Sequence, residues 1–284
     1  MKKVRIFADS TCDLTKDLVE KYNIEILPLY ITIGDRTGKD GVEITREEIF
    51  EWADRNNDTP KTSALTPEDA YNAIKGCKDR GEEGVFIGIS EDMSCTCNVM
   101  RLEADELEYS DKFHVINSMN LSTGIGHLVV NAAIMADQGK SAEEIVSEIE
   151  NLRLKVKSSF VIDTLTYLYR GGRCSAVTAL LANTLKIKPK IIVDNGKMDV
   201  GGKYRGNISL VVKKYVNEME QQLLKARKER VFITHPDMDP DVINTIREYL
   251  KGLNYFDEII ETRAGGVISS HCGPSTVGVL YMEK

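Results

Sequence analysis

Short apolar runs alternate with helix-start signals through the first half of this chain. Four runs have the length and composition of buried strands: residues 4–8, 24–33 with an interruption at Pro28, 84–89 and 113–116. Between them, Thr45 stands three residues before Glu48, which is the spacing of a capping box. Thr66 precedes Pro67, a residue favoured at the first position of a helix. Strands separated by helices predict a parallel sheet with helices on both faces.

The second half of the chain combines helices with a hairpin. Residues 194–197, Asp-Asn-Gly-Lys, are a strong hairpin signal after the apolar run at 190–193. Further strands are expected at 230–234, 258–263 and 276–282, and helices at 141–155, 176–185, 207–228 and 239–253. Strands joined by both a hairpin and helices predict a mixed sheet. The expected fold class is therefore α/β with two domains: an N-terminal domain at residues 1–155 with a largely parallel sheet, and a C-terminal mixed α/β domain at residues 156–284.

Composition narrows the functional classes. The net charge of -7 argues against nucleic acid as the main partner, because phosphate binding needs a basic surface. No apolar run approaches the roughly 20 residues that a membrane span requires, and the first run is too short for a signal peptide. We therefore expect a cytoplasmic protein with at most transient membrane contact. The six cysteines include no C-x-x-C pair, so reduced thiols packed as small apolar residues are expected, with a redox role for Cys95 and Cys97 as the minor alternative.

Hydroxyl-rich segments follow several of the apolar runs. They are residues 9–11, 61–63, 90–94, 117–118 and 269–271. Ligands of open α/β sheets bind beyond the carboxyl ends of the strands, where these segments are expected to lie. The helices after Ser94 and Ser118 would direct backbone N–H groups toward the same region, which favours anions. A helix cap is the more common role for any single serine, but the five segments together favour a site that holds a negative group with hydroxyls.

One of only four histidines, His271, lies in the last of these segments. The apolar residues before it predict a strand that opens into the turn at Gly273 and Pro274. A histidine in such a place can donate a hydrogen bond, accept one or act as a base. The ordinary alternative is a solvent-facing loop histidine. Ser269 and Ser270 beside it argue for a small polar pocket.

The same segments carry a family resemblance that extends over nearly the whole chain. Its carriers are residues 8–14 (Ala-Asp-Ser-Thr-Cys-Asp-Leu), 62–63, 90–96, 117–118 with 122–126, 167–173 (Tyr-Leu-Tyr-Arg-Gly-Gly-Arg) and 271–274 (His-Cys-Gly-Pro). In this order they resemble the DegV family, bacterial fatty-acid-binding proteins that present acyl chains to a fatty acid kinase. Cys95 and Ser275 replace glycines of the family pattern. Because serine adopts positive φ less readily than glycine, the backbone shape at these positions is left open.

The resemblance implies a long-chain fatty acid, such as palmitate, bound between the two domains. The candidate ligand-binding residues are Thr62, Ser63, Ser94, Ser118, Ser270 and His271. Of these, Thr62 and Ser94 are expected to contact the carboxylate, with Ser63 and His271 completing the network. Burying a tail of roughly sixteen carbons at about 0.8 kcal/mol per CH₂ contributes on the order of 10 kcal/mol. The tail therefore dominates affinity, and apolar residues of both domains, including the 176–185 helix, should line its tunnel.

Arg170 and Arg173 flank a Gly-Gly pair within the resemblance. Their guanidinium groups suit contact with a phosphate or a protein surface. The resemblance implies the catalytic subunit of a fatty acid kinase, or the acyl phosphate, as what they contact. The alternative is a surface turn whose arginines pair with local carboxylates.

Two functional classes compete. A carrier would shield a fatty acid and hand it over with no chemistry and no cofactor of its own. A serine/histidine hydrolase of acyl esters would use His271 to activate Ser270 or Ser94. The chain has no G-x-S-x-G elbow and no acidic residue close to His271, which favours the carrier. The missing P-loop pattern likewise disfavours a phosphotransfer role.

Residues 235–241 (His-Pro-Asp-Met-Asp-Pro-Asp) combine a histidine with carboxylates at alternate positions. These residue types suit a metal ion. The two prolines stiffen the segment, and Asp239 followed by Pro240 has the simpler explanation of a helix start. No metal is expected.

Overall fold

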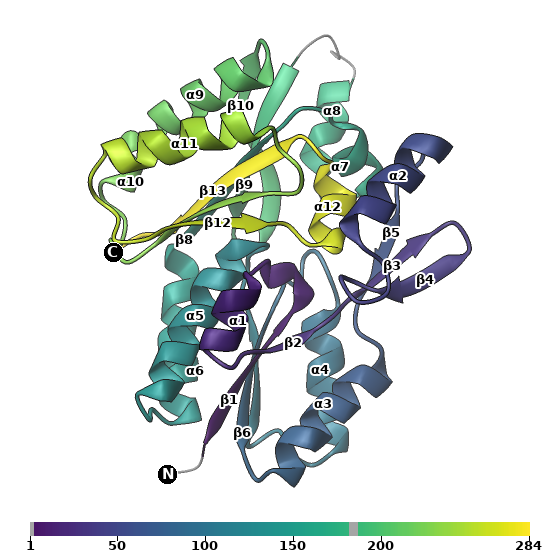
Figure 1. Ribbon diagram of the computed structural model, residues 1–284. Coiled ribbons are helices and arrows are strands. Elements are labelled where there is room, and N and C mark those ends of the chain that lie inside the picture. Colours follow the sequence, from purple (N-terminus) through teal and green to yellow (C-terminus); the bar gives the residue numbers. More distant parts are fainter. Residues whose placement is uncertain (1–2, 182–186) are drawn as a thin grey trace.

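The computed structural model describes residues 3–181 and 187–284, which build three sheets (Figure 1). The first sheet has four strands in the order β2-β1-β6-β7, and every neighbouring pair is parallel. Its strands are β1 (Val4–Asp9), β2 (Glu25–Leu27), β6 (Glu83–Gly88) and β7 (Phe113–Asn117). The alternation in the first half of the sequence is thereby confirmed as a parallel sheet.

Helices cover both faces of this sheet. They are α1 (Lys16–Lys21), α3 (Pro67–Asp79), α4 (Thr96–Glu106), α5 (Thr123–Asp137) and α6 (Ala142–Leu152). Val85 and Ile87 of β6 pack with α5 and α6, whereas Phe86 between them packs with α3 and α4. This alternation follows from the pleat of a strand that is buried on both faces. The predicted helix starts at Thr66 and Ser141 are confirmed as side-chain caps.

A small antiparallel sheet stands beside the parallel one. It consists of β3 (Tyr30–Ile33), β4 (Arg36–Lys39) and β5 (Lys61–Ser63) in the order β4-β3-β5. Helix α2 (Arg46–Asn56) lies between β4 and β5 in the chain and begins with the predicted capping box of Thr45 and Glu48. The expectation that residues 61–63 form a turn beyond a parallel strand is wrong. Thr62 pairs with Ile31 inside this sheet. Three residues without apolar alternation give no strand signal of their own, so pairing with β3 determines their conformation.

The second half of the chain forms a mixed six-stranded sheet in the order β10-β9-β8-β13-β11-β12. The strands are β8 (Val156–Ile162), β9 (Ile187–Asp194), β10 (Lys197–Arg205), β11 (Val231–His235), β12 (Ile259–Arg263) and β13 (Thr276–Met282). The β9–β10 hairpin turns at residues 194–197 as predicted, and only β11 and β12 are paired in parallel. Helices α9 (Ile208–Glu218), α10 (Glu220–Leu223) and α11 (Pro240–Gly252) accompany this sheet.

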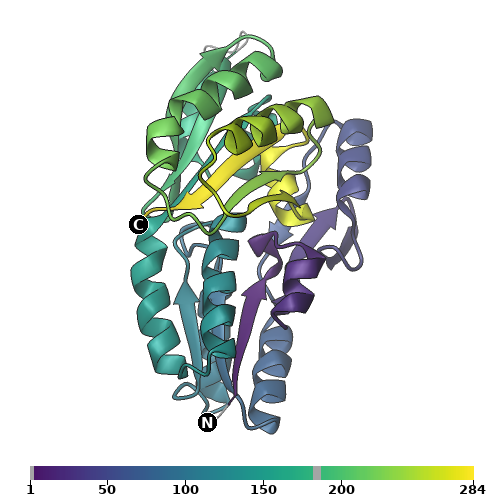
Figure 2. The same ribbon diagram turned by 60° about the vertical axis from the view of Figure 1, so that its left-hand side comes forward.

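The protein therefore has the expected α/β fold with two domains, seen as upper and lower parts in Figure 2. The change of sheet falls between the end of α6 at Leu152 and the start of β8 at Val156. The limits 1–155 and 156–284 remain a prediction. Two short helices, α7 (Thr166–Gly171) and α8 (Thr178–Leu181), and 3-10 turns at Ser10–Cys12, Arg153–Lys155 and Ser175–Val177 complete these regions. Residues 182–185 of the helix expected at 176–185 lie outside the described residues.

The strand expected before His271 is a helix, α12 (Gly266–Cys272). It contacts α2, β3 and β5 of the first half as well as α7 (Figure 1). Gly266 lies so close to the small sheet that a Cβ there would stand 2.6 Å from Cδ1 of Ile31. The apolar residues that suggested a strand are thus the buried side of a short helix. A run of this length does not distinguish the two by periodicity.

Candidate functional site

A cavity of about 220 Å³ brings together residues from distant parts of the sequence. Thr62 and Ser63 reach it from β5, Ser94 from the segment before α4, and His271 from α12. The remaining lining residues are mostly apolar: Leu29, Ala64, Ile89, Met93, Cys95, Leu121, Arg173, Met198, Val267, Ile268 and Cys272. The four polar residues expected to hold a ligand head group therefore share one largely apolar cavity.

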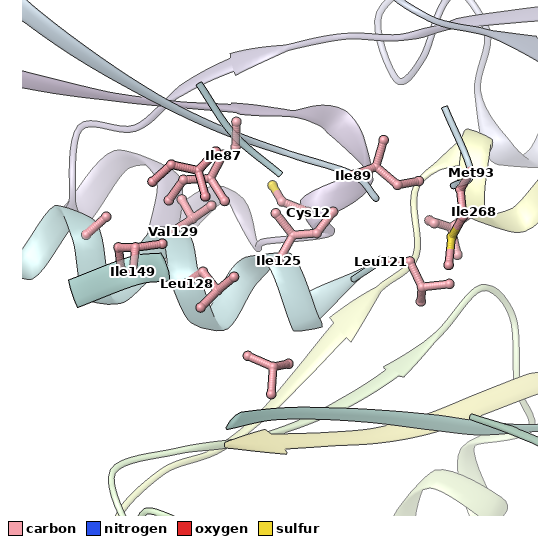
Figure 3. Close-up of a cluster of buried hydrophobic side chains, with 14 of the residues drawn as sticks. Cys12, Ile87, Ile89, Met93, Leu121, Ile125, Leu128, Val129, Ile149 and Ile268 are labelled. Atoms are coloured by element: carbon pink, nitrogen blue, oxygen red, sulfur yellow. The ribbon is translucent and has the colours of Figure 1, made fainter. Parts of the chain in front are cut away.

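This cavity continues the hydrophobic core of the first half. In Figure 3, Ile89, Met93, Leu121 and Ile268 gather at one end of the core cluster, away from Ile149. The first three come from loops that follow strands of the parallel sheet, and Ile268 comes from α12. The cavity thus lies at the edge of a packed core, where helix α12 meets the N-terminal half.

His271 and Thr62 form the central polar contact of the cavity. His271 Nε2 lies 2.8 Å from Thr62 Oγ1. His271 Nδ1 is buried, finds no hydrogen-bond partner among the described residues and faces Gly171, where an added Cβ would stand only 2.3 Å away. Burial of the ring, and to a smaller extent the charge of Arg173, lower the pKa of His271 to about 4. The imidazole is therefore neutral near pH 7.

The tautomer of His271 follows from its two nitrogens. A buried N–H group without a partner is rarer than a buried acceptor without one, so we assign the hydrogen to Nε2. His271 then donates to Thr62 Oγ1, which leaves the hydroxyl hydrogen of Thr62 free for another acceptor. In this arrangement the pair offers a donor through the Thr62 hydroxyl, and the basic nitrogen, Nδ1, faces Gly171.

Ser94 is held by the start of helix α4. Its Oγ accepts a hydrogen bond from the backbone N–H of Thr96 at 3.3 Å and lies 2.9 Å from Thr96 Oγ1. The residue between them, Cys95, is exposed and serves as the N-terminal cap residue of α4 without a side-chain cap. The serine hydroxyl retains capacity for a further contact, because a hydroxyl has one hydrogen and two lone pairs.

The other predicted residues have different surroundings. Ser118 Oγ donates to the carbonyl of Asn120 at 3.3 Å, and Ser270 Oγ donates to the carbonyl of Gly266 at 2.8 Å; neither side chain lines the cavity. The helix expected after Ser118 begins at Thr123, and its cap residue Ser122 faces Asp13 instead. The structure therefore places the hydroxyls of Ser118 and Ser270 outside the cavity lining, although Ser270 is the direct neighbour of His271.

The two arginines also differ. Arg170 is exposed and donates to the carbonyl of Asn57 at 3.0 Å, whereas Arg173 lines the cavity and donates to the carbonyl of Gly171 at 2.8 Å. Arg173 also lines an open, polar pocket of about 660 Å³, together with Met93 and Met198, which belong to both spaces. Arg173 thus stands between the apolar cavity and an open pocket. Among the described residues neither arginine is paired with a carboxylate, which does not match the surface turn with local ion pairs that was the alternative.

A second, smaller apolar cavity shares one wall with the first. It has a volume of about 20 Å³ and is lined by residues of both halves, including Phe160 and Leu280 of the six-stranded sheet. Leu121, Ile268 and Cys272 line both cavities. The apolar path from the hydroxyls therefore continues toward the space between the two domains.

Comparison with known proteins identifies the family. A family model described as "Uncharacterised protein, DegV family" matches residues 3–284. The chain belongs to the DegV family. A DegV domain-containing protein of Clostridium perfringens is 34% identical over 284 residues, with 100% of both chains covered.

Solved DegV structures are similar over the whole chain. One is a DegV family protein from Thermus thermophilus, described for its fatty acid binding, with a TM-score of 0.91 and 27% identity over 99% of this chain and 100% of that one. Another is a stearic-acid-binding protein from Eubacterium ventriosum, with a TM-score of 0.85 and 26% identity over 100% of this chain and 99% of that one. Both similarities extend over both domains of the fold.

The two departures from the DegV pattern do not strain the backbone. Cys95 has φ −84°, and Ser275 is not among the residues with positive φ. Positive φ in the second segment belongs to Gly273, at 78°, where glycine has been kept. Side chains at 95 and 275 are therefore compatible with the DegV fold at these places.

Sequence reasoning missed three contributors to this DegV site. Asp13 and Asp40 accept hydrogen bonds from the start of α12, and Gly171 borders the imidazole of His271. Asp13 and Gly171 lie within the motifs that carry the resemblance, but their partners are more than 90 positions away in the sequence. No pattern in the sequence marks Asp40.

Residues 235–241 have structural partners. His235 Nε2 lies 3.1 Å from Glu261 Oε1, and Asp239 caps α11 with Pro240 at its first turn, as predicted. Within residues 3–181 and 187–284, no group of three or more His, Cys, Asp or Glu side chains is arranged to hold a metal ion. In the same part of the chain, no helix has both the length and the apolar character needed to cross a membrane.

Proposed function

We propose that this DegV protein binds a long-chain fatty acid in the cavity and presents it to a fatty acid kinase, which forms the acyl phosphate. One observation carries the proposal: Thr62, Ser63, Ser94 and a neutral His271 share an otherwise largely apolar cavity. The similar structures from T. thermophilus and E. ventriosum, both described as binding fatty acids, support it. The amphipathic character of the cavity matches a ligand with one polar end and a long apolar chain.

The carboxylate is held by neutral donors in this proposal. His271 donates to Thr62, Thr62 donates to one carboxylate oxygen, and Ser63 and Ser94 supply further hydroxyls. Hydrogen bonds to an ionised acceptor are stronger than those between neutral groups, so a few hydroxyls suffice to orient the head group. None of these four donors forms an ion pair with the carboxylate, which keeps it accessible to phosphorylation. Arg173, a cation in the lining of the same cavity, is assigned to the incoming phosphate.

The acyl chain lies along the apolar wall. It passes Leu121, Ile268 and Cys272 toward the small cavity between the domains, which widens to admit it. Burial of about sixteen carbons supplies on the order of 10 kcal/mol, so the chain provides most of the affinity and the head group provides orientation.

Arg173 and Arg170 are assigned to the partner. Arg173 stands where the cavity meets the open polar pocket, which is the side from which a phosphate donor would approach the carboxylate. Arg170, three residues earlier in α7, is exposed and suits contact with the kinase surface. The side of the molecule with the open pocket beside Arg173 is the proposed docking side.

The hydrolase alternative is disfavoured by His271 itself. In a Ser-His-Asp triad an acid orients the histidine through the nitrogen that does not meet the serine. His271 Nδ1 has no such partner among the described residues, and its pKa of about 4 makes the ring a poor base near pH 7. The carrier is therefore the function that the site supports best.

Mass spectrometry of lipid released by denaturing the purified protein tests the proposal. We expect a fatty acid in near-equal proportion to protein from the wild type.

Thr62→Val removes one donor and should raise the rate of palmitate release about tenfold, since one hydrogen bond to a charged group contributes about 1.5–3 kcal/mol. The matched control is Thr32→Val, whose hydroxyl meets Thr37 on the exposed side of the same small sheet. A wild type that carries no lipid and takes up no palmitate contradicts the proposal. Ester turnover abolished by His271→Ala would support the hydrolase instead.

A further inference from the structure

We infer that Asp40 is the positioning residue for His271, acting through helix α12. Asp40 follows strand β4 in the small sheet and is buried. Its two carboxylate oxygens accept hydrogen bonds from the first backbone N–H groups of α12: Oδ1 from Gly266 at 2.7 Å and Oδ2 from Val267 at 3.3 Å. This inference deepens the proposed function and rests on it for the role of His271.

Both ends of α12 are attached to the same small sheet. Its beginning is held by Asp40, and at its other end His271 Nε2 meets Thr62 on β5. Asp40 is itself fixed, because its backbone N–H donates to the carbonyl of Leu29 at 2.8 Å and Ser10 Oγ donates to its Oδ2 at 2.8 Å. The imidazole lies about 7.5 Å along the helix axis from Gly266, at 1.5 Å per residue. A shift at the start of so short a helix is therefore transmitted to the ring.

The contact leaves no tolerance in its geometry. A Cβ on Gly266 would stand 2.7 Å from Asp40 Oδ1, so the close approach of carboxylate and backbone depends on the missing side chain. Three donors converge on the two oxygens of Asp40: two backbone N–H groups and one hydroxyl. An asparagine amide would turn an NH₂ group toward at least one of these donors.

Asp13 provides a matched control within the same contact. Its Oδ1 accepts from the backbone N–H of Gly265 at 2.7 Å and its Oδ2 from the hydroxyl of Ser122 at 2.6 Å. A hydroxyl accepts as readily as it donates, so an asparagine at 13 can make both contacts, with its NH₂ group donating to Ser122. Burial raises the pKa of both carboxyl groups, that of Asp13 to about 8, so the contrast between the two variants rests on the donors that each side chain must accept. Asp40→Asn should therefore displace α12 and His271 strongly, whereas Asp13→Asn should displace them little.

The first measurement is the titration of the His271 ring by NMR in delipidated protein. In wild type the pKa of His271 is about 4 because the ring is buried. With Asp40→Asn we expect it to rise to about 5 or above, since a loosened α12 admits water to the ring. Asp13→Asn should leave it near the wild-type value. An unchanged His271 titration in folded Asp40→Asn protein overturns the inference.

The second measurement is palmitate release from variants with and without His271. Asp40→Asn should raise the release rate about tenfold in the wild-type background and less than about twofold in the His271→Ala background, because a residue that acts through another has no effect once that residue is gone. An equal rise in both backgrounds means a general structural role and contradicts the inference.

If Asp40→Asn does not fold, Ser10→Ala, which removes one of the three donors, should move the His271 pKa in the same direction by less. No movement there also overturns it. A protein that binds no palmitate refutes the proposed function while the NMR result still decides the role of Asp40.

Discussion

Gly171 determines where the imidazole of His271 can lie. It is the last residue of α7, and its backbone does not require glycine, since its φ is not positive. What requires glycine is the neighbour, because a Cβ would stand 2.3 Å from His271 Nδ1. The proposed head-group site therefore depends on a residue that would supply no atom to the ligand.

Substituting Gly171 changes the position of the His271 ring without changing the ring itself. Gly171→Ala should displace the ring from Thr62 and raise the rate of palmitate release about tenfold, while overpacking costs about 1–3 kcal/mol of unfolding free energy. Stopped-flow release and thermal unfolding measure the two effects. Gly252→Ala, at the end of α11 with no atom within 4 Å of the added Cβ, is the control: it should leave palmitate release unchanged and should not lower the free energy of unfolding. Wild-type release from Gly171→Ala protein would show that the ring does not depend on this contact.

The β9–β10 hairpin is the element that joins the second domain to the Ser94 segment. Ser90 Oγ donates to the carbonyl of Gly196 at the hairpin tip at 2.7 Å, and Lys197 Nζ lies 3.4 Å from Asp92 Oδ1. The first contact is buried and the second is exposed, with 72% of the Lys197 side chain accessible. The two contacts span the same interface but differ in solvent access.

Their contributions to stability should differ accordingly. Ser90→Ala leaves a buried carbonyl without its partner and should lower the free energy of unfolding by about 1–3 kcal/mol. Lys197→Met removes a solvent-exposed ion pair and should change it by less than about 1 kcal/mol. Urea unfolding of both variants measures the difference. The reverse order would mean that the ion pair, rather than the buried hydrogen bond, joins the hairpin to the loop.

Elements with a strong local signal were predictable and those made by distant pairing were not. The caps at Thr45, Thr66 and Ser141 and the turn at 194–197 depend on neighbouring residues, so the sequence alone locates them. The small antiparallel sheet and α12 do not depend on neighbouring residues in this way. Strand β5 owes its conformation to β3, and α12 is fixed by carboxylates more than 220 positions earlier.

The candidate site shows the same division. Thr62, Ser63, Ser94 and His271 were predicted from hydroxyl-rich segments and the resemblance, and the structure places all four in one cavity. Ser118 and Ser270 have the same residue type and similar surroundings in the sequence, but their hydroxyls bond to local carbonyls. Sequence cannot distinguish a hydroxyl that faces a cavity from one that returns to the backbone, because the difference is a side-chain direction.

At the scale of the whole molecule, the proposed acyl path leads toward the space between the two domains. Leu121 lines both the main cavity and the smaller one beyond it, so a larger side chain there should block the path without touching the head-group residues. Leu121→Trp should weaken palmitate binding more than tenfold and leave octanoate binding within about twofold, since only the longer chain reaches past this position. Competition against a fluorescent fatty acid measures both. Equal losses of affinity for the two ligands would mean that the acyl chain does not pass Leu121.

The distance between Thr62 and His271 along the chain has a consequence for biosynthesis. The two residues are 209 positions apart. At roughly 5–20 residues per second, a ribosome needs on the order of 10–40 s to add the second after the first. Throughout this interval the nascent protein exposes the hydroxyls of β5 and the apolar wall beside them without the helix that covers them. A ligand that needs both residues, as the proposed fatty acid does, can thus be captured only by a nearly finished chain.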